Sequence, residues 1–200
     1  MSEPGALTGT PTIVAGLLLD RSVSDDGQLA KLLEICAWFF SLGARHVSVS
    51  GAGNFSPSQM NIVAAGYKLA SSQSLPGEGH SYVLHFVGAH ESHLRFIPAE
   101  GGRQIIVAAA RSLAAVGQSS VIDDEVQRIA GPAPDFLVLF GRAVHLSGSF
   151  VWQAAYAELI PVDETWTNFT ASAADGVCKE FRRRNRRFGA LTESAEPSIP

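Results

Sequence analysis

The chain alternates short, continuously apolar runs with longer segments whose apolar residues recur every three or four positions. Residues 12–19 form such a run, typical of a strand buried on both faces of a sheet. Within residues 28–42 the apolar side chains instead recur at helical spacing, and Gly43 follows as a helix terminator. This alternation of strands and helices predicts an α/β domain with a mainly parallel central sheet, flanked by helices on both faces.

The same pattern continues along the chain. Residues 56–59 have the form of a capping box, with proline at the first helical position, and predict a helix to about residue 72. Residues 74–79 are expected to be a loop. The other expected strands are 45–50, 81–87, 94–97 and 135–140, and the other expected helices are 102–116, 123–130 and 172–187.

Length and composition fit one soluble domain, because 200 residues that are 46% hydrophobic can bury a substantial core. We expect this domain to cover residues 12–189, between a disordered N-terminus (1–11) and a flexible tail (190–200). The sequence has no apolar run long enough to be a transmembrane segment and no signal-peptide pattern at its start, so a cytoplasmic location is expected. Cys36 and Cys178 are expected to be reduced core thiols.

Positive charge gathers near the C-terminus. Residues 179–187 contain five arginines and one lysine, although the formal net charge of the chain is -4. A cluster this local argues against a nucleic-acid-binding surface and suits a diphosphate site. The alternative is a solvated basic face that complements the dipole at a helix C-terminus, and we expect it to hold for most of the cluster.

A resemblance to a known family rests on several motifs. PDFLVLFGRAVHLSGSFVWQAAYAEL, residues 134–159, resembles the C-terminal signature of the cis-prenyltransferases, the undecaprenyl and dehydrodolichyl diphosphate synthases, and the similarity continues through RRFG at 186–189. AGLLLD, SVSGAGNFSPS and EGGRQIIVAA follow the family's order earlier in the chain. The resemblance implies isopentenyl and allylic diphosphates as ligands, with Mg²⁺ as cofactor.

The chain departs from the catalytic members of that family at their diphosphate sites. Those enzymes follow the first strand with Asp-Gly-Asn and then Arg, whereas this chain has Asp20 followed by Arg21. Their Arg-x-Gly after the fifth strand is Leu-Phe-Gly here, ending at Gly141. An arginine bond to a charged group contributes about 1.5 to 3 kcal/mol, so these losses predict a chain that is inactive alone.

Two further positions of that signature also differ. The family's next arginine is His145 and a nearby acid is Ala143, whereas Ser147 remains as a candidate substrate-binding residue. Arg187, Phe188 and Gly189 keep the terminal Arg-x-Gly of the family, and they form the main candidate substrate-binding motif.

This combination resembles the Nogo-B receptor-like subunit of heteromeric cis-prenyltransferases, which lends its terminal Arg-x-Gly to a catalytic partner. The resemblance implies a heterodimer with a catalytic homologue that holds most of the Mg²⁺. One alternative is a divergent homodimeric cis-prenyltransferase making short or branched products. Another is a scaffold that kept the fold and lost the chemistry.

Each remaining candidate residue has two interpretations. Asp20 either binds magnesium as a catalytic residue or caps the turn after the first strand, and the turn is favoured. Glu158 either reaches a magnesium ion or is a half-buried acid bonded to backbone amides. Trp152 and Tyr156 are expected in the core or in a dimer interface. The spacing of His85, His90 and His93 fits no standard zinc pattern, so they are interpreted as surface or strand histidines.

Overall fold

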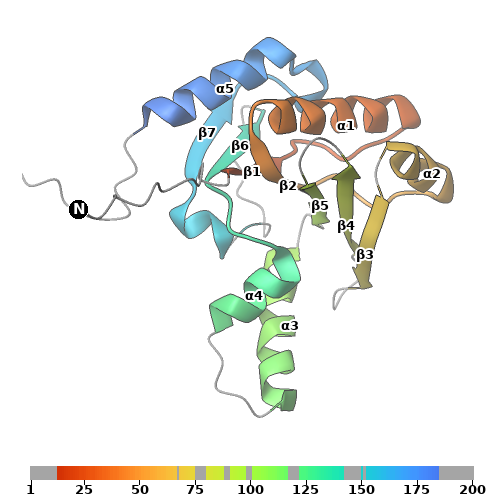
Figure 1. Cartoon of the computed structure of the whole chain (residues 1–200), viewed down its shortest axis with the longest axis vertical. Helices are drawn as coiled ribbons and strands as arrows, with labels where there is room; N and C mark the ends of the chain where they lie inside the picture. The colour runs from red at the N-terminus through yellow and green to blue at the C-terminus, as the bar shows by residue number, and fades with distance from the viewer. Residues whose placement is uncertain are drawn as a thin grey trace, which may run out of the picture.

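The computed structural model describes residues 13–66, 68–74, 80–87, 91–97, 101–116, 122–141, 150 and 152–184. At its centre lies a seven-stranded sheet in the order β3-β4-β5-β2-β1-β6-β7 (Figure 1). The five strands from β5 to β7 run parallel, and β4 and β3 extend one edge in antiparallel pairing. The strands are β1 (Ile13–Leu18), β2 (Ala44–Ser50), β3 (Lys68–Ser74), β4 (His80–Val87), β5 (Glu91–Ile97), β6 (Phe136–Phe140) and β7 (Glu158–Val162).

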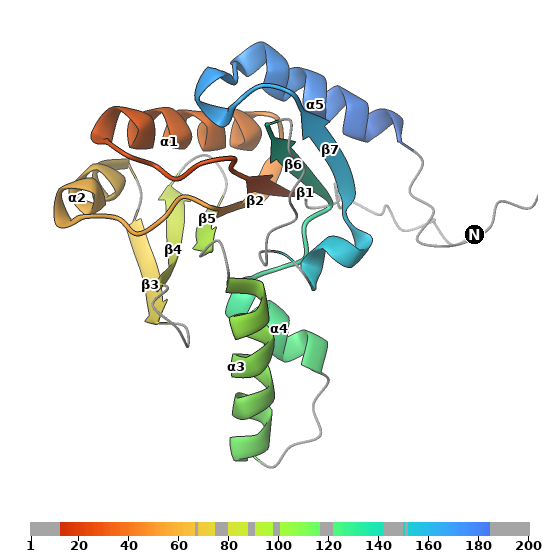
Figure 2. The same cartoon turned by 180° about the vertical axis from the view of Figure 1, so that it is seen from behind.

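Helices lie on both sides of this sheet. Helices α1 and α5 run side by side over one face, whereas α3 and α4 pack against each other and project from the other (Figures 1 and 2). The helices are α1 (Asp26–Ser41), α2 (Pro57–Gly66), α3 (Gly101–Val116), α4 (Ile122–Ala130) and α5 (Ala171–Arg183), with short 3-10 helices η1 (Gln153–Tyr156) and η2 (Trp166–Asn168). The expected α/β architecture with a mainly parallel sheet is confirmed.

The core has two layers, one on each face of the sheet. Leu17 of β1 and Val47 of β2 belong to the larger layer, under α1 and α5. Leu18 and Leu137 belong to the smaller layer, against α3 and α4. Because side chains alternate along a strand, the residues next to Val47, His46 and Ser48, face the α3 and α4 side.

The local signals at the ends of α1 and α2 work as predicted. The backbone N of Ser56 donates to Oε1 of Gln59 over 2.9 Å, and the backbone N of Gln59 donates to Oγ of Ser56 over 3.2 Å. These are the two reciprocal bonds of a capping box. Gly43, which lies just after α1, has a φ of 106°, a conformation that favours glycine.

Three expectations on secondary structure are wrong. The second helix stops at Gly66, and the chain continues into β3, whose serine-rich sequence pairs with β4. Strand β7 was not expected, and its Pro161 is tolerated because β7 is an edge strand of the sheet. The last helix ends at Arg183, because Arg184 adopts an extended conformation with ψ of 136°.

Other expectations concern burial and the ends of the chain. Cys36 and Cys178 are both free and buried, as predicted. Burial raises the pKa of both thiols above the ordinary value. Tyr156 is 70% exposed and Trp152 is 38% exposed, so neither lies in the core of the chain, and their placement in a dimer interface stays a prediction. The predicted N-terminal segment 1–11 and tail 190–200 lie outside the described residues. Within the described residues, no helix has the length and apolar character that a membrane span requires.

Candidate functional site

The loops that follow β1, β2, β6 and β7 meet at the carboxyl ends of the parallel strands. The backbone N of Leu19 donates to the carbonyl oxygen of Ser50, and that of Val23 donates to the carbonyl oxygen of Ala52, both over 3.0 Å. These bonds tie together the loops after β1 and β2. Open α/β sheets bind their ligands at this edge, and the first predicted site residue, Asp20, lies here.

The carboxylate of Asp20 is bonded within the chain. Its Oδ1 accepts from the backbone N of Trp166 over 3.1 Å, and its Oδ2 accepts from Nε of Arg21 over 3.0 Å. The Asp20 side chain is 15% exposed. The indole Nε1 of the fully buried Trp166 donates to the carbonyl oxygen of Arg21 over 2.9 Å. Asp20 and Trp166 therefore join the turn after β1 to the segment after β7.

Gly141 closes the same end of the sheet. Its backbone N donates to the carbonyl oxygens of Val162 and Glu164, both at 3.0 Å. A Cβ at this position would lie 3.0 Å from Cβ of Asp20, and the φ of 86° also favours glycine. The turn that the sequence predicts at Gly141 therefore packs directly against the candidate acid.

Asp20 is the predicted magnesium ligand at this end of the sheet. Mg²⁺ is usually bound through one or two carboxylates together with phosphate oxygens and water. Here the guanidinium of Arg21 already pairs with Asp20, and its positive charge opposes a divalent cation. Among the described residues, no three acidic, histidine or cysteine side chains form a group that could hold a metal.

Glu158 lies at the other end of the sheet from Asp20. It is the first residue of β7 and is paired in register with Phe136, the first residue of β6. Asp20 follows the last residue of β1, so about five residues of strand, or roughly 15 Å, separate the two acids along the sheet. The structure does not bring these two predicted site residues together.

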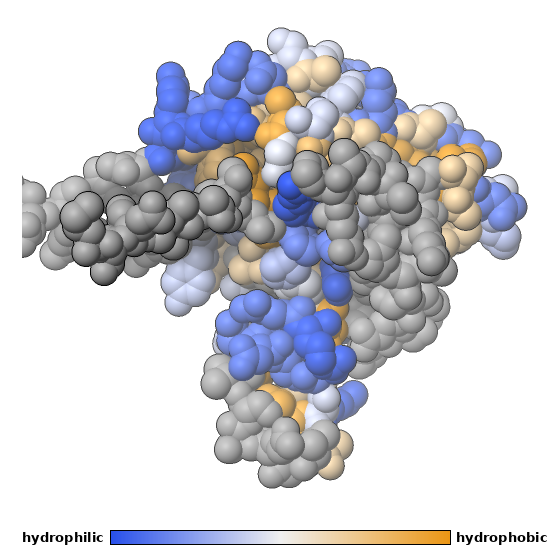
Figure 3. Space-filling view, in the orientation of Figure 1, coloured by the Kyte–Doolittle hydropathy of each residue, from blue (hydrophilic) through white to orange (hydrophobic). Residues whose placement is uncertain are grey.

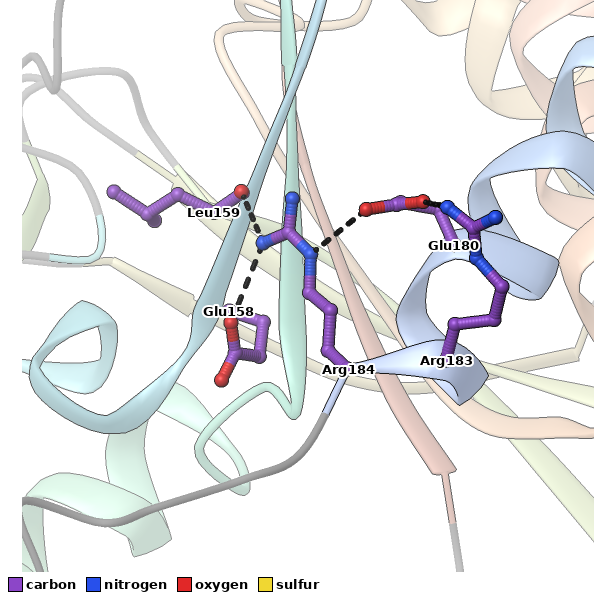
Figure 4. A network of polar contacts seen from close by, with 5 residues as sticks. All are labelled: Glu158, Leu159, Glu180, Arg183 and Arg184. Carbon is purple, nitrogen blue, oxygen red and sulfur yellow. Dashed lines mark hydrogen bonds and ion pairs between the residues drawn. The ribbon is translucent and has the colours of Figure 1, made fainter. Parts of the chain in front are cut away.

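The side chain of Glu158 meets the end of α5 (Figure 4). Its Oε2 accepts from Nη1 of Arg184 over 3.3 Å, and the same Nη1 donates to the carbonyl oxygen of Leu159 over 2.8 Å. Both charged side chains are 30% exposed. Glu158 is thus the half-buried acid of its second interpretation, although its partner is an arginine and not a backbone amide.

The described arginines of the basic cluster form hydrogen bonds and ion pairs with other residues of the chain. Arg184 also donates from Nε to Oε1 of Glu180 over 3.3 Å, and Arg183 pairs with the other oxygen of the same carboxylate. These two arginines hold the pKa of Glu180 below its ordinary value. Nη2 of Arg182 donates to the carbonyl oxygen of Leu42 over 2.9 Å, at the end of α1. Figure 3 shows the hydrophilic surface that these side chains form over the end of α5.

The described arginines therefore support the structural interpretation of most of the cluster, and they fix where α5 ends. Arg187, Phe188, Gly189 and Ser147 lie outside the described residues. The terminal motif begins three residues after Arg184, which is anchored on α5 by Glu180 and on β7 by Glu158. The contacts of Trp166 with Asp20 and of Arg184 with Glu158 could not be predicted from local patterns, because these partners lie 146 and 26 positions apart in the sequence.

Comparison with known proteins agrees with this architecture. Residues 31–189 match the family model described as "Putative undecaprenyl diphosphate synthase". An isoprenyl transferase of Neisseria meningitidis serogroup A is 36% identical over 97 residues, which are 46% of this chain and 39% of that protein. A ditrans,polycis-undecaprenyl-diphosphate synthase of Lactiplantibacillus plantarum is 37% identical over 60 residues, which are 30% of this chain and 23% of that protein. The matches thus span about two fifths or less of the length of these curated relatives.

Two solved structures share the fold at low sequence identity. An undecaprenyl diphosphate synthase structure from Campylobacter jejuni has a TM-score of 0.62 and 15% identity, covering 90% of this chain and all of that one. Lavandulyl diphosphate synthase from Lavandula x intermedia, solved with dimethylallyl diphosphate, has a TM-score of 0.59 and 18% identity, covering 88% of this chain and 97% of that one. Since the family match spans most of the chain, the chain belongs to the undecaprenyl diphosphate synthase family of prenyltransferases.

Proposed function

We propose that this chain is the non-catalytic accessory subunit of a heteromeric cis-prenyltransferase. In this proposal it binds a catalytic homologue and completes that partner's isopentenyl diphosphate site with Arg187, Phe188 and Gly189. The complex transfers prenyl groups from an allylic diphosphate and makes a polyprenyl diphosphate. The Mg²⁺ that neutralises diphosphate charge in the complex is held mainly by the partner.

The observation that carries the proposal is the state of Asp20. Ionisation of an allylic diphosphate develops several negative charges, so catalysis needs a cation and donors that are already in position. Here the acid is paired with Arg21 and accepts from the backbone of Trp166. A divalent cation bound at Asp20 would lie beside the guanidinium of Arg21, and the two positive charges would repel each other.

The anchoring of α5 supports the role of the terminal motif. Arg182 fastens the helix end to α1, and Arg184 fastens it to β7. A side chain that serves another subunit benefits from a rigid base, because less conformational entropy is lost when it binds. In the complex, Arg187 would donate charge-assisted hydrogen bonds to the diphosphate oxygens and Gly189 would donate its backbone N–H.

The test compares the lone chain with a mixture. Purified chain, a catalytic homologue that carries the complete Asp-Gly-Asn loop, and both together are incubated with isopentenyl and allylic diphosphates and Mg²⁺. We expect no polyprenyl product from the lone chain and at least about tenfold more product from the mixture than from the homologue alone. Strong synthesis by the lone chain, or no effect on the homologue, contradicts the proposal.

A divergent homodimeric cis-prenyltransferase is the second candidate. It is favoured by the position of Asp20 at the carboxyl end of β1, the edge where ligands bind in this fold class. In that case Asp20, Ser147, Glu158 and Arg187 would act within copies of one chain. The same assay distinguishes the two functions, since only the homodimeric enzyme makes short or branched prenyl diphosphates without a homologue.

A further inference from the structure

A cavity lies over the middle of β2 and β5, on the α3 and α4 side of the sheet and away from Asp20. It has a volume of about 240 Å³ and is lined by His46, Val47, Ser48, His93, Arg95, Gln127, Gly131 and Pro132. Two of these residues are histidines and one is an arginine, and the described lining contains no carboxylate. Arg95 is the cation of this lining at neutral pH, and the two histidines can become cations when they bind a proton.

The strand register explains how these basic residues meet. In the parallel pairing of β2 with β5, His46 is the partner of His93 and Ser48 is the partner of Arg95. Residues two apart on a strand share a face, so all four lie on the α3 and α4 side. The rings of His46 and His93 are stacked, with centroids 4.8 Å apart and planes within 8° of parallel.

The row continues into the antiparallel strands. His85 of β4 is the register partner of His93, and Lys68 of β3 is the register partner of His85. Four adjacent strands thus carry four residues in one row that are charged or can acquire a positive charge. This row could not be predicted from the sequence pattern, because its members are spread over residues 46–93.

Arg95 is held in place beside the stacked histidines. Its Nη1 donates to the carbonyl oxygen of Ile129 near the end of α4. A Cβ on Gly131 would lie 2.8 Å from Nε of Arg95, so glycine is required for this close approach. Burial lowers the pKa of Arg95 to about 10, and the side chain remains a cation at neutral pH. A guanidinium has five N–H donors, so the bond to Ile129 leaves others for a ligand.

We propose that this cavity binds a small oxyanion of the phosphate class between the His46 and His93 rings and the Arg95 guanidinium. When the histidines are protonated, the three neighbouring basic groups repel one another. A bound anion offsets that repulsion, favours the protonated rings and accepts hydrogen bonds from all three groups. A metal cation fits less well, because Arg95 adds positive charge and the described lining offers no acid. The volume suits a small ion, since pockets for drug-sized ligands start at about 300 Å³.

The proposal does not depend on prenyl transfer, so a binding experiment tests it directly. Isotope-labelled full-length protein is titrated with sodium phosphate at constant ionic strength, and the imidazole resonances are followed by NMR. We expect saturable shifts for His46 and His93. We also expect the pKa of His46 to rise in saturating phosphate, because the bound anion favours the charged ring over repulsion by His93 and Arg95.

Substitutions in the same titration define the site. The double variant His46→Gln, His93→Gln should weaken phosphate binding at least about tenfold, because two charge-assisted donors are lost. Arg45→Gln is the matched control: it removes a positive charge from the same strand at a position outside the cavity lining, and should change the dissociation constant less than about twofold. Thermal unfolding of each variant shows whether it is folded.

A flotation experiment with vesicles distinguishes a lipid headgroup from a soluble ion as the source of the phosphate. Flotation with phosphatidylglycerol vesicles that is lost in the double variant assigns the phosphate to a lipid headgroup. Binding of free phosphate without flotation assigns it to a soluble ion. The proposal is overturned if phosphate gives no saturable shift, if the double variant binds as tightly as the parent, if Arg45→Gln weakens binding equally, or if Zn²⁺ shifts these resonances and phosphate does not.

Discussion

At the carboxyl ends of the parallel strands an acid is bonded to partners of its own chain, whereas on the α3 and α4 side of the sheet three basic residues line a cavity. Asp20 pairs with Arg21 and accepts from the backbone of Trp166. His46, His93 and Arg95 line the cavity over the middle of β2 and β5. Position in an α/β sheet therefore does not by itself identify the ligand site of a particular chain, and the partners of each charged group must be traced.

The arginines of the two regions also differ in what their side chains contact. The described arginines of the C-terminal cluster contact Leu42, Leu159 and nearby glutamates, so they hold α5 in place. Arg95 has one such contact yet still faces a cavity. A basic cluster in the sequence and a basic site in the fold are thus different features of this protein.

Substitution of Trp166, at the carboxyl ends of the parallel strands, should lower the stability of the chain more than any other change considered. This side chain is fully buried, and its indole bonds the turn after β1. Trp166→Ala should lower the free energy of unfolding by about 3 to 5 kcal/mol, measured by urea denaturation. Trp152→Ala is the control, because Trp152 is 38% exposed, and it should cost less than about 1 kcal/mol. Equal losses would contradict the described packing.

Two glycine substitutions test whether Gly131 holds Arg95 in place beside the cavity. Gly131 and Gly43 both have φ in the left-handed region, but only Gly131 lies against another side chain, Arg95. Gly43→Ala should cost about 1 kcal/mol of unfolding free energy from backbone strain alone. Gly131→Ala should cost at least about 1 kcal/mol more, because the new Cβ displaces the guanidinium.

Denaturation curves for the two glycine variants measure this difference, and phosphate titration of Gly131→Ala provides a second readout. Displacement of Arg95 should weaken phosphate binding in that variant and leave it unchanged in Gly43→Ala. Identical costs and identical binding in both variants would show that Gly131 does not position Arg95.

A smaller effect is expected where β7 meets α5. The Glu158 and Arg184 side chains are each 30% exposed, so solvent screens their attraction. A double-mutant cycle with Glu158→Gln and Arg184→Gln should give a coupling free energy below about 1 kcal/mol. A coupling near zero would mean that the bond from Arg184 to the carbonyl oxygen of Leu159 holds the helix end without the acid.

The smallest effect is a pH dependence from His46. Burial, His93 and Arg95 lower the pKa of His46 below its ordinary 6.5. Between 6.5 and the lower folded value the unfolded chain binds more protons, so the free energy of unfolding decreases as pH falls through this window. His46→Gln should flatten the decrease by less than about 1 kcal/mol, since the ring is half-exposed. Parallel pH profiles of parent and variant would contradict this assignment.

Much of the fold follows from local sequence patterns. The apolar run of β1, the capping box at Ser56 and the terminator Gly43 each act through neighbouring residues, and all three are found where predicted. The strand β7 was missed because it contains Pro161 and owes its pairing to β6. The helix expected to reach residue 72 was wrong beyond Gly66 because tertiary pairing with β4 outweighs local propensity.

The candidate sites were less predictable because their contacts are long-range. Asp20 was identified as a turn residue or a ligand, but its partner Trp166 was not foreseeable from spacing. The histidines were judged by their spacing in sequence, whereas strand register brings His46 to His93. The roles of Ser147 and of residues 187–189 stay predictions, since these positions lie outside the described residues.

The proposed subunit role is tested by comparing three variants of this chain in complex with a catalytic homologue. Asp20→Asn keeps an oxygen for the Trp166 amide, Arg187→Ala removes the terminal guanidinium, and Arg186→Ala controls for loss of nearby charge. Initial rates of polyprenyl diphosphate synthesis should fall at least about tenfold for Arg187→Ala and stay within about twofold for the other two. A severe loss for Asp20→Asn with an unchanged rate for Arg187→Ala would contradict the account.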